Sequence, residues 1–246
     1  MKISLHDVEC CCPWETKARW DRETGWSRSV AKLLASITVP GEKRDLVMHT
    51  GWSALMVRCA NPTVTREEVR EMLRLGESVS RKSWYGHTAL MIAITSGASI
   101  LVVRELLSSG ADPNALTRDE ESPLLAALFA RRWELAELLL QAGAETNHRS
   151  RRGYTPLLAA CRMGADATII RLMIDHGADV HARDGQGWTP LMVAVGLHAP
   201  LSVLSALLSS GADPLATDWE GTSALSLALA DSLVPAPAML LRRWIA

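Results

Sequence analysis

The sequence is poor in aromatic residues other than tryptophan and has no long apolar run. It contains one Phe and two Tyr among 246 residues, beside nine Trp. No stretch reaches the roughly 18 consecutive apolar residues that a membrane-spanning helix needs. Residues 1–13 contain no apolar core of the kind that a signal peptide carries. We therefore expect a protein that is not inserted in a membrane and that works in the cytoplasm.

Charge of one sign is not in excess either. The 26 Lys and Arg residues nearly balance the 27 Asp and Glu residues, so that the formal net charge at pH 7 is -1. Proteins that bind nucleic acids or anionic membrane surfaces usually carry a basic excess. The charge balance therefore argues against a nucleic acid or a membrane surface as the general partner.

The motifs of common catalytic and metal sites are also missing. The sequence has no G-x-x-x-x-G-K-[ST], G-x-S-x-G or H-E-x-x-H, and no paired C-x-x-C. Cys10, Cys11 and Cys12 are adjacent, which suits a tetrahedral zinc site poorly; S-palmitoylation and a tail with incidental thiols are the alternatives. The histidines are scattered between predicted turns. We expect no enzyme, no metal, no cofactor and no small-molecule substrate.

What the sequence does contain is a repeat with two markers. The first is Gly, any residue, Thr or Ser, Pro or Ala, and Leu, and its leucines are separated by 33 to 35 residues. It occurs at Gly51–Leu55, Gly86–Leu90, Gly153–Leu157, Gly187–Leu191 and Gly221–Leu225, with a degenerate copy at Glu120–Leu124. The second, Gly-Ala-Asp or Gly-Ala-Glu, keeps the same register at Gly110, Gly143, Gly177 and Gly211. A period near 33 residues indicates a solenoid of stacked units.

Each unit is predicted to contain two helices. In the best copy, the Thr189 hydroxyl can cap the first helix, and Pro190 at its first position removes no hydrogen bond. Residues 191–195 then form a short helix and residues 201–208 a longer one, which Gly211 ends. By the same register, second helices are expected over 100–109, 133–141 and 168–176. The prolines before residue 238 predict that the last second helix begins only after Pro237.

These markers resemble the ankyrin repeat, whose units begin with Gly-x-Thr-Pro-Leu-His and end in a Gly-Ala-Asp turn. The resemblance covers roughly residues 45 to 246 and implies an all-α solenoid of about six helix-turn-helix repeats. The implied repeats are 48–82, 83–116, 117–149, 150–183, 184–217 and 218–246, within a domain 46–246. Residues 1–45 would form an N-terminal tail and a degenerate helical cap. The family's His is replaced throughout, by Met56, Met91, Leu125, Leu158, Met192 and Ser226, which predicts units that rest more on apolar packing.

The resemblance also implies a function, the binding of another protein in a concave groove lined by hairpin tips and short helices. The residues beside each repeat glycine would then face the partner, and they are rich in the Trp, Tyr and Arg of binding hot spots. They are Trp52, Trp84, Tyr85, His87, Arg118, Asp119, Glu121, Arg151, Arg152, Tyr154, Gln186, Trp188, Trp219 and Glu220. Alternatively, a Trp beside a glycine only stacks on the neighbouring hairpin, and both interpretations can hold together.

The consequence of binding stays open at this point. A scaffold or adaptor would link the partner to something else, whereas a stoichiometric inhibitor, such as an immunity protein, would occlude a toxin or enzyme. An enzyme with its catalytic residues in 1–45 is a third possibility, which nothing in that segment favours. Arg131, Arg132 and Trp133 form a further candidate contact with a partner.

Overall fold

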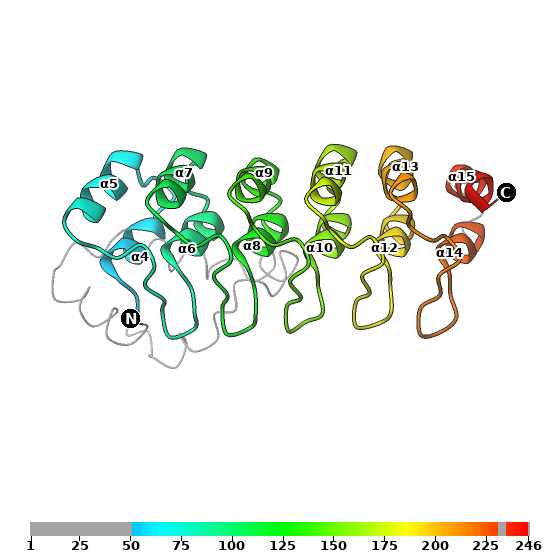
Figure 1. The fold of residues 1–246 in the computed structure, drawn as a ribbon, viewed down its shortest axis with the longest axis horizontal. Coiled ribbons are helices and arrows are strands. Elements are labelled where there is room, and N and C mark those ends of the chain that lie inside the picture. Colours follow the sequence, from blue (N-terminus) through cyan, green and yellow to red (C-terminus); the bar gives the residue numbers. More distant parts are fainter. Residues whose placement is uncertain (1–50, 231–234, 246) are drawn as a thin grey trace, which may run out of the picture.

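The structure, a computed structural model, describes residues 51–230 and 235–245, and in this part of the chain the regular elements are helices. They alternate between two layers that run the length of the molecule (Figure 1). The first layer holds α4 (Ala54–Cys59), α6 (Ala89–Ser96), α8 (Pro123–Phe129), α10 (Pro156–Met163), α12 (Pro190–Gly196) and α14 (Ala224–Ala230). The second holds α5 (Arg66–Arg74), α7 (Ile100–Ser108), α9 (Trp133–Gln141), α11 (Ala167–Asp175), α13 (Leu201–Ser209) and α15 (Pro235–Ile245). The predicted all-α solenoid is confirmed.

The loops that lead into the first-layer helices project from one side of the molecule. In Figure 1 these hairpins hang beside one another from the first layer, while the second layer lies on the opposite side. The predicted N-terminal tail and cap, residues 1–45, lie outside the described residues.

The first-layer helices begin where the capping residues predict. Thr88, Thr155 and Thr189 each accept a hydrogen bond from the backbone N–H three residues later, and Ser53 and Ser122 do the same. Such a cap satisfies one of the backbone N–H groups that a helix start leaves without an intrahelical acceptor. Because α6, α8, α10 and α12 have a neighbour on either side in the layer, they are buried almost all round, as the run Ala89–Ile94 shows.

The residues that replace the family's His are buried apolar side chains in five of the six positions. Met56, Met91, Leu125, Leu158 and Met192 are each at most 1% exposed. At two of them the thioether accepts a weak hydrogen bond from the capping residue's own N–H, at 3.4 Å from Ser53 N to Met56 Sδ and from Thr189 N to Met192 Sδ. At Ser226 the hydroxyl accepts from Ser223 N at 2.8 Å. Apolar packing thus replaces the polar network that His would make.

The second-layer helices follow the predicted register, with one exception. Helix α9 has the predicted bounds, and α7, α11 and α13 agree within one residue at each end. The prediction for α15 is wrong, because the helix begins at Pro235 instead of after Pro237. The N–H groups of a first helical turn have no intrahelical acceptor, so prolines at the first and third positions remove no hydrogen bond.

Ion pairs join the second-layer helices at the N-terminal end of the described array. Glu105 of α7 is buried and accepts hydrogen bonds from Arg66 at 2.6 Å and from Arg70 at 2.9 Å, both on α5. The hydrogen bonds from Arg70 and then Arg66 lower the pKa of Glu105 to about 2. This carboxylate therefore stays ionised at neutral pH and ties α5 to α7.

Two arginines that the sequence suggested as partner contacts donate hydrogen bonds to neighbouring first-layer helices. Arg132 follows α8 and donates hydrogen bonds to the carbonyls of Ile94, at 3.0 Å, and of Ala98, at the end of α6. Arg131 reaches the other way, from Nε to the Met163 carbonyl at the end of α10, at 2.7 Å. The pair thus bridges three consecutive first-layer helices.

Candidate functional site: the hairpin edge

The projecting hairpins form one ordered surface, here called the hairpin edge and made of residues 81–87, 116–121, 149–154, 183–188 and 217–222. Backbone hydrogen bonds cross from one hairpin to the next, from Arg118 N to Tyr85 O at 2.9 Å and from Arg151 N to Asp119 O at 3.1 Å. A longer one joins Trp219 N to Gln186 O at 3.4 Å. These bonds fix the spacing and direction of the hairpins that they join.

Each hairpin is also closed within itself. Ser83 N donates to His87 O at 2.9 Å, and Asp184 N donates to Trp188 O at 3.0 Å. In the latter hairpin the buried Asp184 carboxylate accepts from the backbone N–H groups of Gln186 and Trp188, both at 2.9 Å. This carboxylate therefore stabilises the turn and is not presented on the outer surface.

Two exposed tryptophans stack on glycines of the preceding hairpin. A Cβ built on Gly51 would lie 2.6 Å from the Trp84 ring, and one on Gly187 would lie 2.8 Å from the Trp219 ring. Trp84 is nevertheless 55% exposed and Trp219 is 68% exposed. One face of each indole is therefore used inside the array, while the rest of the ring stays open to solvent.

The structure divides the predicted contact residues into three groups. Glu121 is buried. Trp52, His87, Asp119, Tyr154 and Trp188 are half-buried, and Trp52, Tyr154 and Trp188 pack against the core. The exposed residues are Trp84, Tyr85, Arg118, Arg151, Arg152, Gln186, Trp219 and Glu220. The exposed group belongs to the hairpin edge, and it is the part of the prediction available to a partner.

Further basic residues lie on the hairpin edge, of which the sequence indicated Arg149 by its charge and missed Lys82 and Arg183. Lys82 Nζ donates to the Leu116 carbonyl at 3.4 Å, and Arg149 donates to the Arg183 carbonyl at 2.6 Å. Arg183 donates in turn to the Thr217 carbonyl. Donor and acceptor are 34 residues apart in all three cases, one repeat. The recurrence of a basic residue at 149 and 183, in the register of Lys82, is the sequence signal that could have revealed them.

Arginine–aromatic contacts complete the surface. The Arg118 guanidinium lies over the Tyr85 ring at 5.8 Å from the ring centre, and that of Arg183 lies over Trp219 at 5.4 Å. At these distances a guanidinium is attracted to the ring face. Rings and cations therefore hold each other in place along the edge.

The comparison with protein families agrees with this geometry. A family model described as ankyrin repeats (3 copies) matches residues 24–117 and 120–231, which is most of the chain. The chain belongs to the ankyrin-repeat family. Ankyrin repeats are generally protein–protein interaction modules and are typically non-catalytic.

Curated relatives share part of this ankyrin array. The chain is 38% identical over 101 residues to "Ankyrin repeat, SAM and basic leucine zipper domain-containing protein 1" of Echinops telfairi. The proteins of the same name from Oryctolagus cuniculus and Pongo abelii are 39% and 40% identical over 101 residues. Each match covers 39% of this chain and 21% of the relative. The matched part therefore spans about a fifth of the length of these relatives.

Glu121 departs most from the predicted arrangement of the ankyrin hairpins. It follows Glu120, which occupies the repeat-glycine position with a φ of 58°. Its side chain is 2% exposed, and its Oε2 has no hydrogen-bond partner. Burial raises its pKa to about 8, although Arg152 acts in the opposite direction. The expectation that this carboxylate faces a partner is therefore wrong, because its position after the glycine points into the array.

Replacing Glu121 by glutamine should stabilise the protein at high pH. The folded state holds a proton on Glu121 that the unfolded state releases near pH 4.5, so stability should fall as pH rises from about 4.5 to about 8. Gln removes this loss, and because one pKa unit corresponds to about 1.4 kcal/mol, we expect a gain of at least about 2 kcal/mol at pH 9 and little change at pH 5. Urea unfolding of both proteins at the two pH values measures the difference.

The exposed neighbour Glu120 provides the matched control, because its replacement by Gln should change stability little at either pH. A Glu121→Gln gain of the same size at pH 5 and pH 9 would contradict the buried, protonated carboxyl.

The described part of the chain offers neither a cluster of metal ligands nor a membrane-spanning helix. Over residues 51–230 and 235–245, no three His, Cys, Asp or Glu side chains lie together as metal ligands would. Within the same ranges, no helix has the length and apolarity needed to cross a membrane.

Proposed function

We propose that this ankyrin array is a non-catalytic binding module that docks a partner protein along its hairpin edge and the adjacent first-layer helices, as a scaffold or adaptor. The observation that carries the proposal is the exposure of Trp84, Tyr85 and Trp219 on hairpins that backbone hydrogen bonds already hold in register. Large aromatic side chains dominate binding hot spots. A surface that is ordered before binding loses little conformational entropy when it docks.

The contrast between the second layer and the hairpin edge also supports the hairpin edge as the side that docks a partner. Between α5 and α13 the exposed large apolar residues of the second layer, Leu75, Leu101 and Leu201, are aliphatic and far apart in the sequence, and the exposed Trp244 lies at the C-terminal end, on α15. On the hairpin edge, by contrast, aromatic rings and guanidinium groups alternate in direct contact. A partner of ordinary size would bury about 800 Å² of this chain, which is an area that several neighbouring hairpins can supply.

The test is affinity capture from cell lysate with the wild type and with the triple variant Trp84→Ala, Tyr85→Ala, Trp219→Ala, followed by mass spectrometry. We expect the triple variant to lose the specific partners by at least tenfold in recovered amount. The matched control is Leu75→Ala, Leu101→Ala, Leu201→Ala on the second layer, which should keep them. Circular dichroism establishes that both variants are folded. A folded hairpin variant that recovers the same partners in the same amounts would refute the proposal.

The captured partner also distinguishes an adaptor from a stoichiometric inhibitor. An adaptor leaves the activity of a captured partner unchanged, whereas an inhibitor abolishes that activity at a one-to-one ratio. Adding the purified protein to the captured partner and titrating its activity distinguishes these outcomes.

A further inference from the structure

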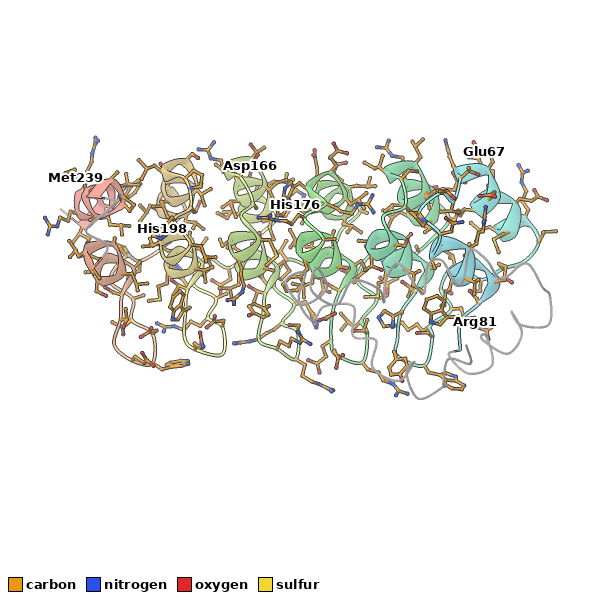
Figure 2. The ribbon with its side chains drawn as sticks, turned by 180° about the vertical axis from the view of Figure 1, so that it is seen from behind. Glu67, Arg81, Asp166, His176, His198 and Met239 are labelled. Atoms are coloured by element: carbon orange, nitrogen blue, oxygen red, sulfur yellow. The ribbon has the colours of Figure 1, made fainter. Side chains whose placement is uncertain are left out.

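The basic residues of the hairpin edge are concentrated on three successive hairpins. Arg81, Lys82, Arg118, Arg149, Arg151 and Arg152, here called the basic strip, are all exposed. Figure 2 shows Arg81 on the hairpin side of the molecule, whereas Glu67 and Asp166 lie over the second layer on the opposite side. The net charge of -1 for the whole sequence thus hides a local concentration of basic residues on these hairpins.

Carboxylates within the same three hairpins compensate little of this charge. Asp119 forms an ion pair with Arg151, at 3.7 Å, and Glu120 is exposed. Glu121 is buried beneath the strip, and burial raises its pKa to about 8, which keeps most of it uncharged at neutral pH. The six basic side chains are therefore accompanied by only two ionised carboxylates, the paired Asp119 and the exposed Glu120.

The hydrogen bonds of the strip leave its charge available. Lys82 and Arg149 donate to backbone carbonyls of the next hairpin rather than to carboxylates. A carbonyl positions a cation without neutralising it, and a guanidinium has five N–H donors, so most of them remain for a ligand. Arg118 is held over the Tyr85 ring, and a stacked guanidinium still presents its N–H edge to a carboxylate.

We infer that the basic strip binds an acidic, extended peptide segment of the partner, with carboxylates at every third residue. This inference rests on the proposed function and names the chemistry of the partner. Packed helices lie about 10 Å apart, and so do the hairpins that lead into them. A polyproline II segment advances about 3.1 Å per residue and returns to the same face every third residue. Its carboxylates would meet one hairpin each, over about seven to nine residues in total.

The other side of the molecule favours a peptide over a nucleic acid as the occupant. The exposed charges of the second layer are mixed, with the carboxylates Glu67, Glu71, Glu134, Glu137 and Asp175 beside the guanidinium groups of Arg66, Arg74, Arg104 and Arg171. A nucleic acid that continued past the strip would carry a charge on every residue, which this surface does not match with a continuous basic face. A short segment with a charge on every third residue matches the strip alone.

The experiment uses a fluorescein-labelled nonapeptide of the repeating pattern Glu-Pro-Ala, titrated with the full chain and followed by fluorescence anisotropy. The comparison peptides replace Glu by Gln, or gather the three Glu at one end. We expect the patterned peptide to bind at least tenfold more tightly than either, and to lose affinity as salt is raised. Equal binding of the patterned and clustered peptides would overturn the spacing argument, and no binding of the patterned peptide would overturn the inference.

The protein variants test the location. Arg81→Glu with Arg118→Glu should weaken binding of the patterned peptide at least tenfold, because each change reverses a charge on the strip. The matched control, Arg104→Glu with Arg171→Glu, reverses two exposed charges on second-layer helices α7 and α11 and should leave binding unchanged. Equal losses from both double variants would show a general effect of charge and would refute the assignment of peptide binding to the basic strip.

Two outcomes separate this inference from the proposed function. If the aromatic triple variant loses its protein partners while Arg81→Glu with Arg118→Glu keeps them, the binding module stands and the acidic-peptide inference fails. If a labelled single-stranded RNA of twelve uridines binds more tightly than the patterned peptide, and the strip variant loses it, a nucleic acid is the occupant and the inference is overturned.

Discussion

Replacing Gly86 by alanine should lower the free energy of unfolding by about 2–4 kcal/mol, because two costs add. Gly86 has a φ of +82°, a left-handed conformation that disfavours any residue with a Cβ. In addition, a Cβ at this position would lie 2.8 Å from Thr117 Cα and 3.0 Å from Leu116 O. Both are backbone atoms of the next hairpin, which the Arg118–Tyr85 hydrogen bond holds in place, so they cannot rotate away.

Gly110→Ala is the matched control for this prediction. Gly110 has a φ of +89°, but a Cβ built there meets no atom within 4 Å. Its replacement should therefore cost only the left-handed conformation, about 1–2 kcal/mol. Urea unfolding followed by circular dichroism at 222 nm measures both variants under one protocol. Equal losses for the two substitutions would show that the close approach of the Thr117 backbone contributes nothing.

The fold could be predicted from the sequence because its determinants are local and repeat. A Thr or Ser cap, a proline at the first helical position and a glycine after the second helix each act within a few residues. Copies of this set in one register specify the order and length of the helices. The exception is the start of α15, because the sequence alone does not say whether Pro235 and Pro237 lie before the helix or in its first turn. A proline breaks a helix where the backbone N–H of that position would donate to an intrahelical carbonyl. It is tolerated in the first turn, where no such carbonyl exists.

The candidate site was less predictable, because burial depends on the neighbouring repeat. Trp188 and Trp219 both lie within two residues of a repeat glycine in the sequence, yet Trp188 packs against the core and Trp219 is exposed. Trp188 follows its glycine and turns toward the first-layer helices. Trp219 precedes the glycine of its own hairpin by two residues and reaches back over Gly187. The hydrogen bonds of Lys82 and Arg149 could not be predicted, because their acceptors lie one repeat away.

Replacing Arg132 by alanine should lower the free energy of unfolding by about 2–3 kcal/mol. Its half-buried guanidinium donates to the carbonyls of Ile94, at 3.0 Å, and of Ala98. These carbonyls lie at the C-terminal end of α6, where backbone acceptors have no intrahelical donor and the helix dipole is negative. The substitution leaves them without this donor and removes the positive charge that faces the dipole.

Arg131→Ala is the control that tests whether this cost is specific. Arg131 is exposed and donates one hydrogen bond, to Met163 O at 2.7 Å. Water can replace an exposed donor, so we expect a loss below about 1 kcal/mol. The difference between the two variants would be read from urea unfolding, and equal losses would contradict the assignment of Arg132 as the principal bridge.

The Arg132 contact also makes a prediction about cooperativity. Each unit of a solenoid is stabilised largely by its interface with the next, and weakening one interface divides the array into parts that unfold separately. Arg132 joins residues 34 to 38 positions apart in the sequence, so it contributes to the interface between α6 and α8. Amide hydrogen exchange of Arg132→Ala should therefore quicken in α4 to α7 more than in α10 to α13. Uniform acceleration along the whole array would indicate that the interface at α6 is not a point of division.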